Sequence, residues 1–107
     1  YPLMAAAIES AKENGVDYHV GNILSSDTFY SDDAEASAKW RKLGVMAVEM
    51  EAAALYMNAA RAGKNALAIL TISDHLLTGE ATTAEERQNS FTQMMEVALE
   101  TAVKMSR

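Results

Sequence analysis

The run ALAILTI at residues 66–72 is the feature that most constrains how this chain can fold. It is apolar and becomes β-branched toward its end. Such a run predicts a strand of a parallel sheet, because helices cover both faces of that kind of strand. Two shorter patterns predict further strands: an alternation of apolar and polar residues at 16–24, and an apolar run at 45–48.

Helical patterns alternate with these strands. Pro2 suits the first turn of a helix, and apolar residues at helical spacing continue from there to a stop signal at residues 14–15. Asp32 resembles the cap of a short helix that ends at Gly44. A third helical pattern covers residues 50–62 and is followed by a glycine.

The last helix has a clear start signal. Thr83 and Glu86 stand at the spacing of a capping box, in which each side chain accepts a hydrogen bond from the other residue's backbone N–H. Apolar residues then recur on one stripe, which we expect to face the core: Phe91, Met94, Met95, Ala98, Leu99, Ala102 and Val103. The alternation of helices and strands predicts an α/β fold with a parallel sheet.

The size of the chain allows one domain with a modest core, since 107 residues are half apolar. Three strands make a thin sheet, and a strand as apolar as 66–72 needs neighbours on both sides. We therefore expect further strands from a missing part of the same chain or from a partner. The chain also begins with Tyr1 instead of methionine, as a piece of a longer chain would.

Composition excludes several classes of function. A net charge of −6 argues against a nucleic acid or an anionic membrane as partner, since these need a basic surface. No apolar run approaches the roughly 20 residues that span a bilayer, and we expect no secretion signal. Zero cysteines exclude disulfides and thiolate zinc sites and fit a cytoplasmic protein. His19 and His75 are not at metal-ligand spacing, so we expect no metal.

Polar residues follow each predicted strand. Since ligands of open parallel sheets bind at the carboxyl ends of the strands, these groups are expected on one rim. They are Ser25, Ser26 and Asp27 after the first strand, Glu49 and Glu51 after the second, and Ser73, Asp74 and His75 after the third. A cap or a turn explains Asp27 taken alone. The whole rim is harder to explain in that way.

Glu49 and Glu51 have two readings. A carboxylate in the first turn of a helix gains about 0.3–1 kcal/mol from the helix dipole, and one of the two needs no further role. A carboxylate that points into the crevice needs hydrogen-bond donors, which the neighbouring hydroxyls of a sugar would provide.

Arg87 stands four residues before Phe91, on the same predicted stripe. An arginine near a helix N-terminus opposes the dipole, and an inward-facing one is costly without an anion. We expect an anionic partner on the rim, with Asp74 the nearest candidate. A purely structural ion pair is the alternative.

The segments GNILSSDTFY, VEMEAAALY, LTISDH and TTAEERQ, in this order, closely resemble the carboxyl-terminal half of the bacterial hexameric purine nucleoside phosphorylases. These enzymes belong to the nucleoside phosphorylase and nucleosidase superfamily. The resemblance covers nearly the whole chain. It implies that residues 1–107 are half of one three-layer α/β domain, and that the reaction is phosphorolysis of purine (deoxy)ribonucleosides to the base and (deoxy)ribose 1-phosphate.

The resemblance also implies roles for residues that bind the nucleoside. Phe29 would pack against it, and Val48 would form part of the apolar base pocket. Met50 and Glu51 would hold the ribose, Glu51 through its hydroxyls. Glu49 would line the site beside the base.

The catalytic residues follow from the same resemblance. Asp74, flanked by Ser73, would be the general acid toward purine N7, and Arg87 would be its partner. Arg87 would close on Asp74 when substrates bind and stabilise the carboxylate as the proton leaves. Inorganic phosphate would be the co-substrate, with no cofactor or metal.

The family's phosphate site has no counterpart in these residues, because glycine, arginine and serine residues of the amino-terminal half build it. A neighbouring subunit of a homo-oligomer, a hexamer in this family, supplies further residues. We therefore expect no phosphorolysis by the chain alone. A hydrolytic nucleosidase of the same superfamily and a non-catalytic fragment or interaction module are the alternatives.

Overall fold

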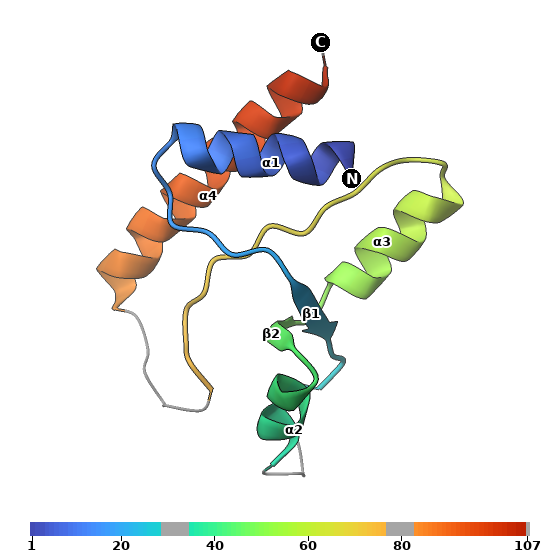
Figure 1. Ribbon diagram of the computed structural model, residues 1–107, viewed down its shortest axis with the longest axis vertical. Helices are drawn as coiled ribbons and strands as arrows, with labels where there is room; N and C mark the ends of the chain where they lie inside the picture. Colours follow the sequence, from blue (N-terminus) through green and yellow to red (C-terminus); the bar gives the residue numbers. More distant parts are fainter. Residues whose placement is uncertain (29–34, 77–82, 107) are drawn as a thin grey trace.

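The structure is a computed structural model, and it describes residues 1–28, 35–76 and 83–106. Helices and strands alternate along the chain (Figure 1), in the order α1 (Pro2–Glu13), β1 (Asn22–Ser25), α2 (Ala36–Lys42), β2 (Val45–Glu49), α3 (Ala52–Arg61) and α4 (Ala84–Met105). The predicted α/β class is confirmed. Asp32, the expected cap of α2, lies outside the described residues.

The sheet consists of β1 and β2, which pair in parallel. Ile23 lies opposite Ala47, and Ser25 lies opposite Glu49. Because parallel strands end at the same edge, this register places the polar residues after β1 next to those after β2. The alternating pattern at 16–24 predicted a longer strand than the observed β1.

The prediction of a third strand at residues 66–72 is wrong for this structure. The stretch forms no ladder and runs as a stretched segment between α3 and α4 (Figure 1). A strand's backbone groups need a neighbouring strand, and no strand of the described chain lies against this one. One backbone group is satisfied in another way, because the Ala68 N–H donates to the Tyr56 hydroxyl of α3 at 2.8 Å.

The core lies where α1 and α4 cross (Figure 1). Small side chains are buried there, Ser10 and Ala11 from α1 among them, with Val97 and Thr101 from α4. Small residues allow close approach of two helices, but they bury little apolar area. At the rim of this contact, Lys104 forms ion pairs with Glu13 at 2.8 Å and with Glu9 at 3.4 Å, and such surface pairs contribute little to stability.

The start of α4 is as predicted. The Glu86 N–H donates to the Thr83 hydroxyl at 3.1 Å, and the Thr83 N–H donates to the Glu86 carboxylate at 3.3 Å. The predicted core-facing stripe of α4 is wrong in its orientation. The helix buries Val97 and Thr101 instead, while Leu99 is 68 % exposed.

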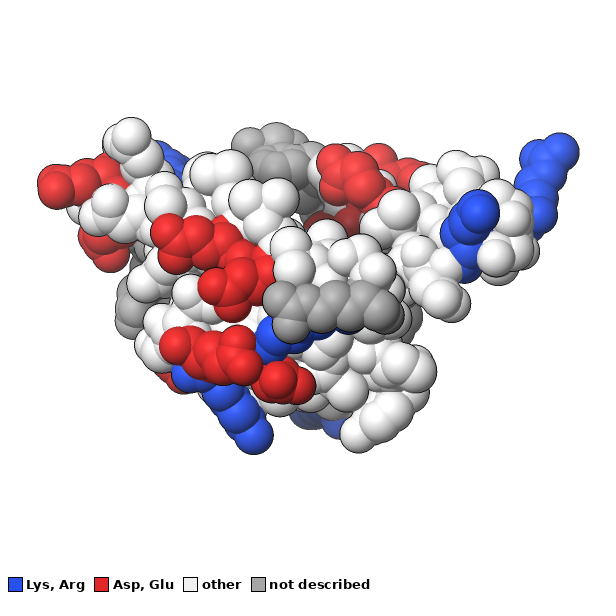
Figure 2. Space-filling view, turned by 90° about the horizontal axis from the view of Figure 1, so that it is seen from above, with Lys and Arg blue, Asp and Glu red and all other residues white. Residues whose placement is uncertain are grey.

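Acidic and basic side chains are unevenly spread over the molecule. On the face seen from above, acidic side chains occupy several neighbouring areas and basic ones stand apart from each other (Figure 2). Among the described residues, no helix combines the length and the apolar character needed to cross a membrane.

The α1–α4 contact gives a first prediction. The Ser10 hydroxyl is fully buried and has no hydrogen-bond partner in the described structure. An unsatisfied buried hydroxyl costs free energy, so Ser10→Ala should raise the free energy of unfolding by about 1 kcal/mol or more in urea titrations. Ser90→Ala, at a half-buried site within α4, is the control and should gain only about 0.5 kcal/mol from helix propensity. Equal gains at the two sites would contradict the assignment of a penalty to the buried hydroxyl.

Candidate functional site

The candidate site begins where the carboxyl ends of β1 and β2 meet. Ser25 and Glu49 are paired across the strands, and the Ser26 N–H donates to the Glu49 carbonyl at 2.9 Å. The Ser25 hydroxyl accepts a hydrogen bond from the Ala53 N–H of α3 at 3.1 Å. The first two of the three predicted polar groups therefore lie together, at the N-terminus of a helix.

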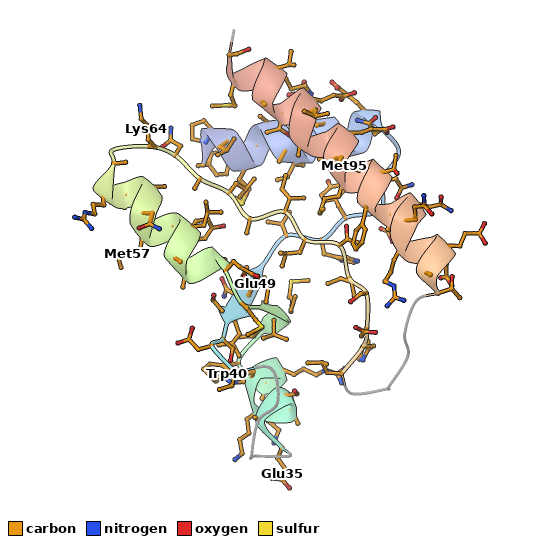
Figure 3. All side chains as sticks on the ribbon, turned by 180° about the vertical axis from the view of Figure 1, so that it is seen from behind. Glu35, Trp40, Glu49, Met57, Lys64 and Met95 are labelled. Carbon is orange, nitrogen blue, oxygen red and sulfur yellow. The ribbon has the colours of Figure 1, made fainter. Side chains whose placement is uncertain are left out.

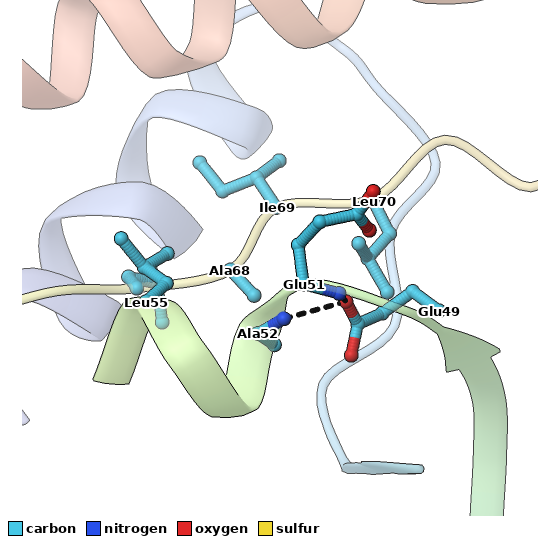
Figure 4. A pocket seen from close by; sticks show the side chains of 8 residues that line it. Glu49, Glu51, Ala52, Leu55, Ala68, Ile69 and Leu70 are labelled. Carbon is cyan, nitrogen blue, oxygen red and sulfur yellow. Dashed lines mark hydrogen bonds between the residues drawn. The ribbon is translucent and has the colours of Figure 1, made fainter. Parts of the chain in front are cut away.

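Glu49 caps α3. One oxygen of its carboxylate accepts hydrogen bonds from the Glu51 N–H at 2.5 Å and the Ala52 N–H at 2.7 Å (Figure 4). The cap sets the helix start at Ala52, two residues later than the sequence indicated, because the backbone between strand and helix turns around the carboxylate. Glu49 thus makes the helix-terminal interaction that the sequence assigned to one of its two carboxylates.

The environment of Glu49 favours its charged form. Burial raises the pKa of the Glu49 carboxyl, but hydrogen bonds from the backbone of Glu51 and Ala52 and from Ser25 outweigh this effect and leave the pKa below its ordinary value of 4.5. The other carboxylate oxygen, Oε1, is shielded from solvent and has no partner in the described structure. The side chain lies where β2 passes into α3 (Figure 3).

A pocket of about 260 Å³ opens beside this junction, and Glu51 reaches over it (Figure 4). Glu51 is exposed, and its carboxylate accepts only a weak hydrogen bond from the Met50 N–H at 3.2 Å. The opposite wall is the stretched segment, so one side of the pocket is acidic and the other apolar. The pocket is lined by Glu49, Glu51, Ala52, Leu55, Leu67, Ala68, Ile69 and Leu70.

Two other predicted nucleoside contacts lie outside the lining of this pocket. Val48 and Met50 are 43 % and 42 % exposed, so their apolar side chains are available but not assembled into a base pocket. Phe29 lies outside the described residues.

The predicted catalytic pair is not joined in this structure. Asp74 is exposed, and its carboxylate accepts a hydrogen bond from the Ser73 hydroxyl at 2.9 Å. Arg87 is half-buried in the first turn of α4 and makes no ion pair with Asp74 or with any other described residue. The pairing on substrate binding stays a prediction.

The sequence did not reveal two of the contacts that build the site. The Ser25 hydroxyl serves a helix 28 positions away, a contact that only the pairing of β1 with β2 creates. Tyr56 holds the backbone of Ala68, and no local pattern indicates that. Among the described residues no three His, Asp or Glu side chains gather as they would around a metal ion, and the prediction of a metal-free site stays a prediction.

Comparison with known proteins gives matches over the whole chain. The model of the phosphorylase superfamily matches residues 1–107. A DeoD-type purine nucleoside phosphorylase of Clostridium beijerinckii is 58 % identical over 105 residues, which are 98 % of this chain and 44 % of that protein. A protein of the same name from Exiguobacterium sibiricum is 56 % identical, and one from Clostridium perfringens is 54 % identical; each is covered to 45 %. The chain spans less than half the length of these relatives.

The cap made by Glu49 gives a pH-dependent prediction. Since the native pKa of this carboxyl is depressed, its contribution to stability is present above pH 4.5 and is lost as the pH falls through the lower native value. Glu49→Gln should therefore lower the thermal midpoint near neutral pH, and the difference from the unaltered chain should vanish well below 4.5. Circular dichroism melts over a pH series measure this.

The control for that series is Glu85→Gln, which removes an acidic charge from the first turn of α4. Its effect should be small, since Glu85 is exposed and α4 has its own capping box. A difference between Glu49→Gln and the unaltered chain that persists at low pH would show that the side chain acts through packing and not through its charge.

Proposed function

Because this chain belongs to the phosphorylase superfamily, we propose that it is the carboxyl-terminal half of a purine nucleoside phosphorylase domain and supplies the base-and-ribose side of the active site. The observation that carries the proposal is the junction of β1, β2 and α3, which sets Glu51 over a pocket with one apolar wall. The names of relatives up to 58 % identical support the same reaction. The whole enzyme would convert a purine (deoxy)ribonucleoside and phosphate to the base and (deoxy)ribose 1-phosphate.

In this proposal Glu51 binds the ribose. An ionised carboxylate only accepts hydrogen bonds, and the described chain gives Glu51 a single weak donor, so two sugar hydroxyls would satisfy it. Met50, exposed on the same turn, would pack against the sugar ring. Val48 and Phe29 would contribute to the base pocket.

Glu49 has a positioning role in this scheme. Its carboxylate binds the backbone N–H of Glu51 directly, so it fixes where the ribose-binding residue leaves the end of β2. The geometry thus favours a role in positioning Glu51. The resemblance implies a different role, a direct contact beside the base. Orientation of a binding group by a fixed backbone avoids the entropy cost of ordering it when the substrate arrives.

Asp74 would be the general acid. The protonated carboxyl transfers its proton to purine N7, the C1′–N9 bond breaks, and its electron pair stays on the purine. A phosphate oxygen then forms the new bond to C1′. Ser73, which already donates to the Asp74 carboxylate, would hold the side chain in place. Arg87 would approach and stabilise the carboxylate that remains.

The proposal extends to the assembly. Inorganic phosphate would be the co-substrate, with no cofactor. Arginine and glycine residues outside these 107 residues would bind the phosphate, so the chain alone would not catalyse phosphorolysis. The enzyme would be a cytoplasmic homo-oligomer, as the resemblance to the hexameric phosphorylases implies.

A chimera tests the reaction. The 105 matched residues of the Clostridium beijerinckii relative are replaced by those of this chain. The chimera should release hypoxanthine from inosine only when phosphate is present, and the isolated chain should release none. Release without phosphate would identify a hydrolytic nucleosidase, and release by the isolated chain would overturn the proposal that the phosphate site is elsewhere.

The same chimera tests the general acid. Asp74→Asn should lower kcat by about 10²–10⁴, the usual contribution of a positioned acid, while KM changes much less. The matched control is Asp27→Asn, the same substitution after β1, which should leave turnover nearly unchanged. Unaltered turnover of inosine by the Asp74→Asn chimera would end the general-acid assignment.

A further inference from the structure

The stop signal after α1 is also the single Asn-Gly pair of the sequence, Asn14 and Gly15. Asparagine is one of the thermally labile residues, because its side-chain amide can be lost. The loss is easiest before glycine, since a residue without a side chain lets the next backbone nitrogen approach most freely. Neither residue lines the pocket beside Glu51, so the chemistry of this pair is separate from that of the candidate site.

The side-chain amide of Asn14 joins α1 to α4. Its nitrogen donates to the Ser10 carbonyl at 2.7 Å and to a carboxylate oxygen of Glu100 at 2.8 Å. Asn14 and Glu100 are both half-buried, and they lie at the crossing of α1 and α4 that forms the core. An ionised carboxylate at position 14 could make neither bond, because it has no hydrogen to donate.

The surroundings of this amide are acidic. Lys104 already pairs with Glu9 at 3.4 Å and with Glu13 at 2.8 Å, and among the described residues Glu100 forms no ion pair. A carboxylate at position 14 would therefore lie close to the Glu100 carboxylate with no cation paired to either. Like charges at so short a distance repel each other.

The folded helix end keeps the Asn14 amide away from the backbone nitrogen that would attack it. The ψ angle of Asn14 is 0°, which turns the Gly15 nitrogen toward the backbone nitrogen of Asn14 and away from its side chain. The Gly15 N–H also donates to the Lys12 carbonyl at 3.1 Å, so the proton that must leave is held in place. Gly15 has a φ of 64°, the left-handed conformation that closes many helices. The pair is therefore protected as long as the last turn of α1 is formed.

We propose that Asn14 is a deamidation site that is closed while the last turn of α1 is formed and open when that turn unfolds, and that the acid so produced loosens α1 from α4. Helix ends unfold locally at a much lower free energy than the core, so the reaction does not require unfolding of the whole chain. The proposal concerns the covalent state and the stability of this chain and is independent of the proposed reaction.

The covalent step consumes water and releases ammonia. The Gly15 nitrogen attacks the Cγ atom of Asn14 and gives up its proton. The bond from Cγ to Nδ2 breaks, ammonia leaves with that proton, and a five-membered cyclic imide remains. Water then cleaves either of the two C–N bonds of the ring, which gives aspartate or isoaspartate, and nothing is oxidised or reduced. Both products carry a carboxylate where the amide had donated.

Peptide mapping tests the site. The chain is incubated at mildly alkaline pH with and without urea, and mass spectrometry follows the conversion of each asparagine to an acid. Asn14 should convert in both samples, at least about tenfold more slowly without urea, because the folded turn protects it. Asn58, exposed on α3 and followed by alanine, is the internal control and should convert much more slowly than Asn14 in urea. Equal rates for Asn14 with and without urea, or no conversion there, would overturn the proposal.

Asn14→Asp tests the consequence, since it introduces the carboxylate directly. The equilibrium constant for folding, measured in urea titrations, should fall about tenfold, because two acceptors lose their donor and two carboxylates meet. Asn89→Asp is the matched control, the same substitution at an exposed position of α4, and should change the constant by about twofold at most. Equal losses for the two variants would contradict the proposed effect on the contact between α1 and α4.

A double variant identifies the partner. Glu100→Gln combined with Asn14→Asp reverses the direction of the hydrogen bond, since the glutamine amide can donate to the new carboxylate. The folding constant should rise at least about threefold above that of the Asn14→Asp chain. No recovery would show that the loss comes from the helix end alone and would refute the role of Glu100.

Discussion

The hydrogen bonds of Glu49 determine the geometry on which the rest of the site depends. Its carbonyl binds the backbone after β1, and its carboxylate binds the backbone at the start of α3. The Ser25 hydroxyl adds a second contact from β1 to the same helix. Two strands and a helix are thus joined through one residue, and Glu51 is placed at the turn that results. A carboxylate suits this position, because a helix N-terminus offers several N–H donors together with a favourable dipole.

Local signals were sufficient for the end of α1 and the start of α4. The capping box at Thr83 and Glu86 and the stop after α1 need only neighbours within a few residues, so the sequence specified them well. The predicted start of α3 was less accurate, because the carboxylate that binds the start of this helix belongs to a residue of the preceding strand. The rim at Ser25 and Glu49 was also predictable, since parallel strands must end at one edge of their sheet.

Residues 66–72 show why the remainder was not predictable. Their composition describes the environment in which a strand is stable, with helices on both faces and a strand on each side. The described chain provides helices but no neighbouring strand. The backbone of residues 66–72 therefore lacks the partner that the hydrogen bonds of a parallel sheet need. The predicted core-facing stripe of α4 was wrong for the same reason, because periodicity shows that a face is apolar but not which of two apolar faces the available partner covers. Both errors concern partners and not the propensities of the residues.

The charge of the site supports a division of the active site between two parts of a domain. Glu51 and Asp74 are the acidic residues that the proposal places against the nucleoside, Glu49 holds the backbone of Glu51, and the chain carries a net charge of −6. Acceptors of this kind suit sugar hydroxyls and a protonated purine, but they repel a phosphate dianion at close range. Among them Arg87 is the single cation in the proposed scheme, and it serves Asp74. In the proposed function, phosphate would therefore be held by cationic and backbone N–H groups outside these 107 residues.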